Sequence, residues 1–223
     1  STAMRSHGVP GGRSGAITSS GAAGGTKPGS GSSRWKGTES TVTAPSCPVG
    51  GRRGSMPDVP DVIRLILDDH ESFRARFAEL DGLRDDPVAA AAVWGPLAAD
   101  LEVHASAEEE HFYPELLARV GKEEETEDAV GDHDDIRSGI RAAADAEQGS
   151  DAWWAGIDAA REANDHHLAE EESDDLAPFL EKVSPADRAE IGERFVAFRR
   201  EHAHGAGLDY SDRGADEYMA EHT

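Results

Sequence analysis

The sequence has a single cysteine, Cys47, so an intramolecular disulfide and a metal site built from several thiolates are both excluded. It also lacks an apolar run near the ~20 residues that a membrane-spanning helix needs, and its first residues lack the apolar stretch of a secretory signal. Basic residues are scarce: 22 Lys and Arg stand against 45 Asp and Glu, for a net charge of −23 at pH 7. A surface this acidic repels nucleic acid and anionic membranes, so neither is expected as a partner. Because the sequence has one cysteine and lacks a secretory signal at its start, a reducing cytoplasm is the expected location.

The composition changes near residue 56. Residues 1–55 are rich in Gly, Ser, Thr and Pro, and they contain a single acid, Glu39. They offer too little apolar surface to offset the entropy of ordering, so we predict a disordered tail. Ser1-Thr2-Ala3 resembles a cloning remnant, and Met56 is a candidate native start. We expect residues 56–183 to form one helical domain and residues 184–223 to add a helix and an acidic tail.

Apolar residues recur at steps of three and four along the remaining sequence, and the alternation of strands is missing, which predicts an all-α fold. The expected helices cover roughly residues 58–83, 87–120, 124–146, 151–183 and 185–202. Gly95-Pro96 predicts a kink, or a short helix before a longer one, and Tyr113-Pro114 predicts a later bend. Beyond Gly205 the chain is polar, and we expect it to be frayed.

The second helical segment carries His104 and Glu108. Residues four apart stack on the same face of a helix, and Leu97 and Leu101 lie on this face, so it is expected to point into the core. Burying a carboxylate costs several kcal/mol unless a metal or a charged partner compensates it. The pair therefore predicts metal ligands.

The same pair recurs as His167 and Glu171, while His70 and His133 lie singly on the apolar stripes of two other helices. Any one of them alone would most simply be a core imidazole hydrogen-bonded to the backbone. Four helices that each direct ligands inward at mid-length are how helix bundles hold metal pairs. Imidazole and carboxylate together favour iron or manganese over copper(I), which prefers sulfur.

Neighbouring residues offer alternatives on the fourth helix. His166 lies half a turn from the apolar stripe and is expected to face solvent, so we prefer His167 and Glu171 to the pair His166 and Glu170. Glu172 would approach the site only if the helix bulged.

Further candidates follow Glu108. His111 could be an extra ligand, an outer hydrogen-bond donor or a histidine at the pocket mouth. Tyr113 could ligate the metal, donate to a bound oxygen species or simply pack near the helix end. Glu109 and Glu110 are expected on a solvated face. A ferritin-like site would need Glu-x-x-His on two helices, and only Glu108-x-x-His111 has that spacing.

Taken together, these segments resemble the hemerythrin-like family of HHE cation-binding domains over about residues 60–180. The resemblance rests on Ile66-Leu-Asp-Asp-His70-Glu-Ser-Phe73, His104-x3-Glu108-Glu-Glu-x-Phe-Tyr113-Pro114, His133-Asp-Asp-Ile-Arg and His167-x3-Glu171-Glu172. It implies an up-down-up-down four-helix bundle with two non-haem iron ions. It also implies that Glu108 and Glu171 bridge the ions and that His70, His104, His133 and His167 are terminal ligands.

Two positions depart from the oxygen-carrying hemerythrins. Those proteins have a second helix-3 histidine where this chain has Arg137, and an aspartate where it has Glu172, which argues against simple reversible oxygen storage. The expected function is binding or sensing of O2, NO or peroxide, or of iron and redox state. A di-iron oxidase or peroxide-consuming enzyme, and a metal-free helical interaction module, are the alternatives. No segment identifies a redox partner.

Overall fold

The computed structural model describes residues 61–222, whose regular structure is entirely helical. The predicted all-α class is therefore confirmed, while the tail predicted for residues 1–55 lies outside the described residues. In chain order the elements are α1 (Val62–Asp81), α2 (Pro87–His111), α3 (Tyr113–Val120), α4 (Glu123–Asp145), α5 (Asp151–Glu170), the π-helical η1 (Glu171–Asp175), α6 (Leu176–Lys182), α7 (Pro185–Glu201), the 3-10 turn η2 (Ala203–Gly205) and α8 (Ala215–His222).

Four side-chain caps set the starts of the long helices. Each accepts a hydrogen bond from a backbone N–H two or three residues further on, at 3.1 or 3.2 Å: Asp61 before α1, Asp86 before α2, Ser150 before α5 and Ser184 before α7. Such a cap stabilises a helix by about 1 kcal/mol. Gly121 ends α3 in the left-handed conformation, with φ of 77°. These boundaries follow the sequence prediction closely.

The two proline-containing segments of this region have different effects on the helix. Pro96 lies inside an uninterrupted α2, so the separate short helix considered there is not formed. A single missing backbone hydrogen bond is tolerated because Trp94 and Leu97 anchor both sides of it in the core. The bend predicted at Tyr113-Pro114 is confirmed: α2 ends at His111, and α3 begins at Tyr113. Pro114 stands in the first turn of α3, where its missing N–H costs nothing.

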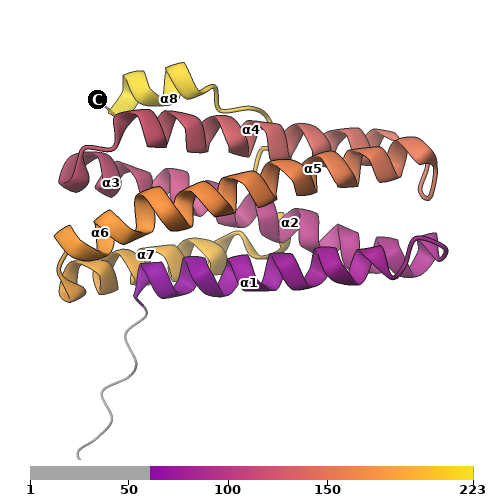
Figure 1. Ribbon diagram of the computed structural model, residues 1–223, viewed down its shortest axis with the longest axis horizontal. Helices are drawn as coiled ribbons and strands as arrows, with labels where there is room; N and C mark the ends of the chain where they lie inside the picture. The colour runs from indigo at the N-terminus through magenta and orange to yellow at the C-terminus, as the bar shows by residue number, and fades with distance from the viewer. Residues whose placement is uncertain (1–60, 223) are drawn as a thin grey trace, which may run out of the picture. The chain divides into compact units, whose positions relative to one another are not determined.

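The helices α1, α2, α4 and α5 form an up-down-up-down bundle (Figure 1). Within it, α4 and α5 approach each other most closely. A Cβ atom on Gly139 would lie 2.4 Å from the backbone N of Ala160, and one on Gly156 would lie 2.4 Å from that of Ala143. Side chains larger than hydrogen at these two positions would push the helices apart.

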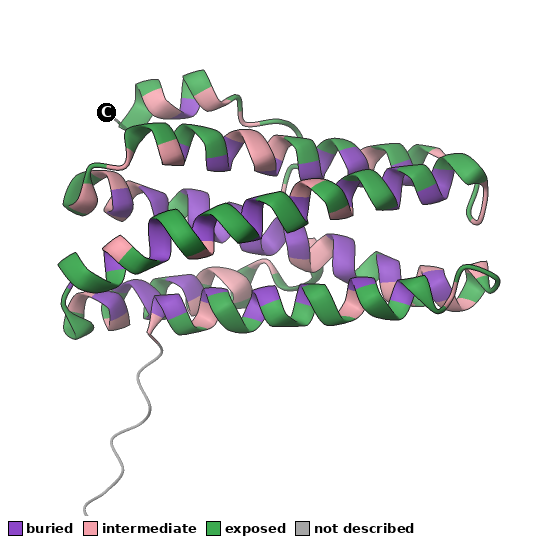
Figure 2. Ribbon diagram, in the orientation of Figure 1, coloured by how far each residue is buried: buried purple, intermediate pink, exposed green. Residues whose placement is uncertain are grey.

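Two apolar clusters fill the bundle, and the histidines separate them. Ile66, Phe112 and Phe179 belong to the cluster at the α3 and α6 end, while Phe77 and Ile157 belong to the cluster at the opposite end. On α1, α2 and α4 the buried histidine falls between a residue of one cluster and a residue of the other, and His167 on α5 falls between Ala160 of one cluster and Leu176, on α6, of the other. Figure 2 shows buried residues, in purple, recurring along the bundle helices. The polar layer at mid-length is therefore closed off from both ends.

The C-terminal segment packs onto the bundle. The helix α7 contacts α1 and α2, and α8 lies over α4 (Figure 1). The Tyr218 hydroxyl donates to the backbone carbonyl of Glu109 at 2.7 Å, and Asp134 accepts from the backbone N–H groups of Arg213 and Gly214. The prediction of a frayed segment beyond Gly205 is thus wrong, because these few contacts anchor an otherwise polar sequence.

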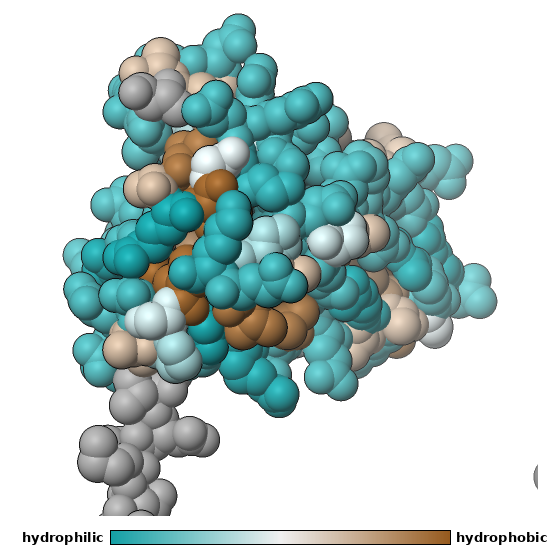
Figure 3. Space-filling view, turned by 60° about the vertical axis from the view of Figure 1, so that its left-hand side comes forward, coloured by the Kyte–Doolittle hydropathy of each residue, from teal (hydrophilic) through white to brown (hydrophobic). Residues whose placement is uncertain are grey.

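The outer surface is mostly hydrophilic. The view of the end that bears α3 and α6 shows teal residues around a smaller hydrophobic area (Figure 3). Leu180 on α6 is an exposed large apolar side chain, at 52% of its full area. No helix between residues 61 and 222 has both the length and the hydrophobicity needed to cross a membrane.

Candidate metal centre

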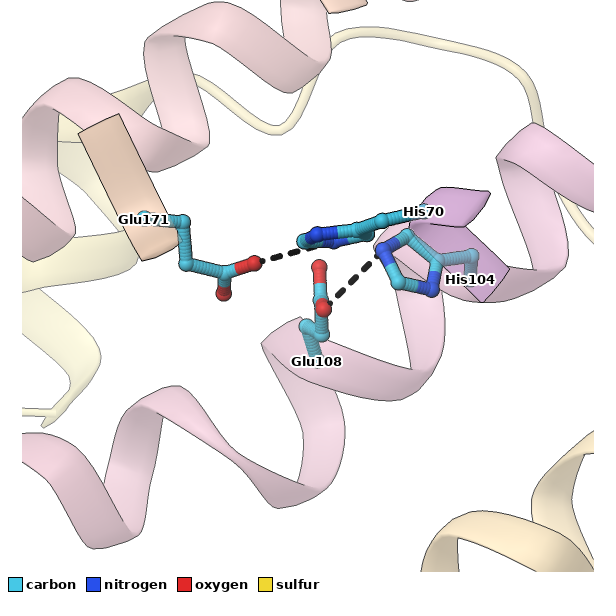
Figure 4. A group of neighbouring side chains, drawn as sticks. All are labelled: His70, His104, Glu108 and Glu171. Carbon is cyan, nitrogen blue, oxygen red and sulfur yellow. Dashed lines mark ion pairs between the residues drawn. The ribbon is translucent and has the colours of Figure 1, made fainter. Parts of the chain in front are cut away.

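Four buried side chains from α1, α2 and η1 meet at mid-bundle: His70, His104, Glu108 and Glu171 (Figure 4). One nitrogen or oxygen atom of each lies within 4.8 Å of the others. The Nε2 atom of His70 is 3.2 Å from Glu171 Oε2, and that of His104 is 3.0 Å from Glu108 Oε1. None of the four residues is more than 3% exposed.

A second group adjoins the first and shares Glu108 with it. Glu108, His133 and His167 also place ligand atoms within 4.8 Å of one another. Glu108 Oε2 lies 3.3 Å from His133 Nε2 and 3.9 Å from His167 Nε2. The two oxygens of one carboxylate therefore face imidazoles from opposite sides of the bundle. The structure thus brings together all six residues that the sequence proposes as ligands.

The inward atoms of the first group lack hydrogen bonds. Among the described residues, His70 Nε2, His104 Nε2, Glu108 Oε1 and Glu171 Oε2 are buried without a hydrogen-bond partner, because the close approaches given above lack hydrogen-bond geometry. Each unsatisfied buried group costs roughly 1–3 kcal/mol. A cation at this point would satisfy all four at once, and the donor set suits iron or manganese. The residues present therefore fit a metal.

In each of the four buried histidines of these two groups, the outward ring nitrogen, Nδ1, faces a carboxylate. The Nδ1 distances are 2.9 Å from His70 to Glu172, 3.2 Å from His104 to Asp69, 2.9 Å from His133 to Glu109 and 3.9 Å from His167 to Asp132. A carboxylate beside Nδ1 favours the proton on that nitrogen and leaves the Nε2 lone pair directed inward. This arrangement prepares His70, His104 and His133 as metal ligands, whereas the 3.9 Å between His167 and Asp132 is too long for a hydrogen bond.

The protonation of the metal-free site follows from the same contacts. Burial alone would lower the pKa of His104, but the Glu108 carboxylate and Asp69 outweigh it and raise the pKa to about 10. The pKa of His133 is likewise raised to about 9, against its burial, by Glu108 and Glu109. Burial, and then the neighbouring charge of His133, lower the pKa of His167. A charged His133 can therefore donate to a neutral His167 across the 3.1 Å between their Nε2 atoms.

The fourth ligand helix bulges at the site. After Glu170, α5 continues as the π-helical turn η1, in which backbone hydrogen bonds span five residues where an α-helix spans four. Glu171 faces the centre, and Glu172 accepts from both His70 Nδ1 and Arg74, at 2.9 and 2.8 Å. The bulge considered from the sequence is present, and it places Glu172 outside both groups, as a partner of His70.

A family model described as the hemerythrin HHE cation binding domain matches residues 61–180, more than half of the 223-residue chain. The chain belongs to the hemerythrin family. The resemblance drawn from the sequence is thereby confirmed, and the described function of this family is cation binding. Comparisons with curated proteins and with solved structures gave no match. The hemerythrin domain runs from the cap of α1 into α6, so α7 and α8 lie beyond the matched region.

An ion-pair network that the sequence prediction missed lies beside this hemerythrin centre. Glu109, expected on a solvated face, is only 5% exposed and accepts hydrogen bonds from His133, Arg137 and Arg213. Burial would raise its pKa, but His133 and then Arg137 lower it to about 2. Arg137 points away from the centre and also donates to Glu102 at 2.9 Å. The available signal was the seven-residue spacing of Glu102 and Glu109, which places both on one helix face.

Two further candidates take different places in the hemerythrin domain. His111 is partly exposed, and its ring centroid lies 5.5 Å from that of Phe198 on α7, so it belongs to neither ligand group. The Tyr113 hydroxyl is buried 3.5 Å from Glu108 Oε2 and 3.4 Å from Glu171 Oε1. Burial, and then Glu171 and Glu108, raise its pKa well above the usual range, so this hydroxyl stays protonated and remains a donor.

Proposed function

We propose that this hemerythrin domain holds two non-haem iron ions, with manganese as the second choice of metal. His70, His104, Glu108 and Glu171 would hold one ion, and Glu108, His133 and His167 would hold the other. The observation that carries the proposal is the position of Glu108, whose Oε1 faces His104 at 3.0 Å and whose Oε2 faces His133 at 3.3 Å. One carboxylate shared between two sets of imidazoles suits a pair of cations.

We infer that the centre binds or senses O2, NO or peroxide, or reports iron and redox state. Reduced non-haem iron supplies open coordination positions for such small ligands. Three Nδ1 carboxylates, Glu172, Asp69 and Glu109, orient the imidazoles of His70, His104 and His133, and the two apolar clusters cover the two ends of the polar layer. Tyr113 holds a hydroxyl proton beside both Glu108 and Glu171, where it can donate to a small bound ligand.

The size and charge of the cavity beside the centre support the binding of a small ligand. The cavity that reaches His167 and Glu171 has a volume of about 210 Å³, and carboxylates dominate its lining. A drug-sized organic substrate usually occupies a larger and mostly apolar pocket. The cavity therefore favours cations and small neutral molecules over an organic anion or an apolar substrate.

A peroxide-consuming enzyme or oxidase is the second candidate function. The buried Tyr113 hydroxyl favours it, because a proton donor within 3.5 Å of both shared carboxylates could assist turnover. Replacing Tyr113 with Phe is expected to leave the metal content unchanged. A large loss of peroxide turnover in this variant would support the enzyme, whereas unchanged turnover would count against it.

The decisive experiment is elemental analysis of the purified protein together with absorption spectra. We expect two iron ions per chain, and spectra that change on reduction and on adding NO or peroxide. A protein that binds no transition metal, even after incubation with anaerobic Fe²⁺, would contradict the proposal and favour a metal-free helical interaction module. If two ions are bound but the spectra do not change when these ligands are added, the metal-binding proposal stands and the ligand-binding proposal is contradicted.

A further inference from the structure

The four carboxylates behind the histidines are not equivalent. Three of them are each held by an arginine: Glu172 by Arg74 at 2.8 Å, Asp69 by Arg199 at 3.0 Å and Glu109 by Arg137 at 2.9 Å. Asp132 has no such arginine between residues 61 and 222, and its nearest ion-pair partner is His167 Nδ1 at 3.9 Å. That distance is too long for a hydrogen bond. On this side the outer carboxylate is free to interact with something else.

Asp132 lines the cavity of about 210 Å³ between α4 and the α5–η1 segment. His167 and Glu171 form its buried end, and the other lining residues are Glu124, Glu125, Asp128, Ala129, Glu170, Asp174 and Asp175. Lys122 pairs with Glu125, but no Lys or Arg lines the cavity itself. At about 30 Å³ per water, the volume admits a divalent cation with its hydration shell.

Asp175 gives independent evidence for a ligand in this cavity. Its side chain lines the cavity, the residue is only 3% exposed, and its Oδ1 has no hydrogen-bond partner. A buried carboxyl oxygen without a partner is costly, and a cation would satisfy it.

The outer mouth of the cavity carries a third group of donors. Asp132, His166 and Glu170 place ligand atoms within 4.8 Å of one another, and two of the three, Asp132 and Glu170, also line the cavity. The side chains of His166 and Glu170 are 59% and 51% exposed. This surface group therefore has the same donor types as the buried centre and shares two residues with the cavity that reaches His167 and Glu171.

We propose that this cavity is the entry path of the centre for divalent cations such as Fe²⁺ or Mn²⁺. Asp132, His166 and Glu170 capture the hydrated ion, the lining carboxylates lower its energy on the way in, and Asp175 passes it to Glu171 and His167. The inference rests on the proposed metal-binding function, because a path needs a destination. Concentrated charge of one sign at a cleft is known to raise the arrival rate of the opposite charge by 10- to 1,000-fold.

The test measures uptake rate and final content separately. The metal-free full-length protein is mixed with anaerobic Co²⁺ as the probe, the rise of absorbance is followed by stopped flow, and the bound metal is then counted by elemental analysis. The variants are His166→Gln/Glu170→Gln, in which both changes are exposed and folding is not at risk, and the same pair with Asp175→Asn. We expect uptake to slow about tenfold in the first and further in the second, with the final content unchanged.

A matched control variant distinguishes the effect of the entry path from the effect of the protein's overall charge. The variant Asp85→Asn/Asp145→Asn removes two negative charges, the same number that the triple path variant loses at Glu170 and Asp175. Its changes lie in the α1–α2 turn and at the last residue of α4, at the opposite end of the bundle (Figure 1), and it is expected to load at the wild-type rate. Equal uptake rates in path and control variants would overturn the proposal. A lower final content in the Asp175→Asn variant would make Asp175 a ligand and overturn its assignment to the path. If the wild-type protein bound no metal, the proposed function would fail instead.

Discussion

Arg137 and Glu109 form a bidentate ion pair inside the protein, with nitrogen-to-oxygen distances of 2.9 and 3.0 Å. Their side chains are 1% and 5% exposed. Glu109 also accepts from His133, and Arg137 also donates to Glu102. The pair therefore connects His133, a proposed metal ligand, with the buried Glu102 on α2.

We predict that Arg137→Leu destabilises the metal-free protein by about 3–5 kcal/mol, because Glu102 and Glu109 are left buried without their counter-ion. Urea denaturation monitored by circular dichroism measures the change. Arg141→Leu, one turn along α4, is the control: its partner Asp212 is 56% exposed, so the loss there is expected to stay near 1 kcal/mol or below. Equal losses of unfolding free energy in the two variants would show that the buried ion pair stabilises the protein no more than the exposed one.

The second prediction concerns the close packing of α4 against α5. Gly139→Ala places a Cβ atom 2.4 Å from the backbone of Ala160, so the helices must separate. We expect a loss of about 1–3 kcal/mol in stability and a weaker affinity for the metal at His133 and His167. Gly131→Ala, in the same helix, meets nothing within 4 Å and should be neutral or stabilising by up to about 1 kcal/mol. A stable Gly139→Ala variant with normal metal affinity would contradict the packing argument.

The shared position of Glu108 distinguishes it from the histidines. Glu108→Ala is expected to abolish binding of both ions, whereas His104→Ala should leave at most one and destabilise the metal-free bundle by several kcal/mol, because Glu108 loses its charged neighbour. His111→Leu should bind the full complement, since His111 contacts Phe198 and neither ligand group. Elemental analysis of the three variants decides. Loss of metal from the His111→Leu variant would show that His111 is a metal ligand after all.

Metal uptake should release protons. In the metal-free protein the pKa values of His104 and His133 are raised to about 10 and 9, so both imidazoles are charged at pH 7.5. A metal needs their neutral form, so loading should release about two protons, and the apparent affinity should rise with pH up to roughly pH 9–10. Calorimetry in buffers of different ionisation enthalpy counts these protons. Uptake without proton release would rule out one or both histidines as ligands.

The same raised pKa values predict how pH affects the stability of the metal-free fold. An imidazole with a folded pKa above its unfolded value of 6.5 stabilises the fold fully below pH 6.5, and this contribution is lost as pH rises through the folded value. Stability should therefore fall between about pH 6.5 and 10, an effect that bound metal removes. Urea denaturation at pH 6 and pH 10, with and without metal, measures it.

Much of the candidate site could be predicted because its signals are local. A spacing of four residues places His104 beside Glu108 and His167 beside Glu171 on any α-helix, and the apolar stripe distinguishes the buried His167 from the exposed His166. The capping residues Ser150 and Ser184 act within three residues of their own position, so the helix starts were also predictable.

The missed features depend on residues far apart in the sequence. Glu109 was assigned to a solvated face because its own helix gives no reason to bury it; Arg137 on α4 and Arg213 near α8 supply the reason. The helix α8 was missed for the same cause, since Tyr218 is anchored by a carbonyl 109 residues earlier. No window of a single helix contains these contacts.

By itself, the sequence determined an all-helical domain, its helix starts, and six inward-facing histidines and glutamates, because periodicity and capping act within a turn or two of one chain segment. Only the tertiary structure decided that Glu108 stands between two sets of imidazoles, that three outer carboxylates are held by arginines while Asp132 faces an acidic cavity, and that α8 covers α4. The reason is physical: burial and charge compensation depend on how separate helices pack, and the energy of a carboxylate in the core is set by the partners that other helices bring to it.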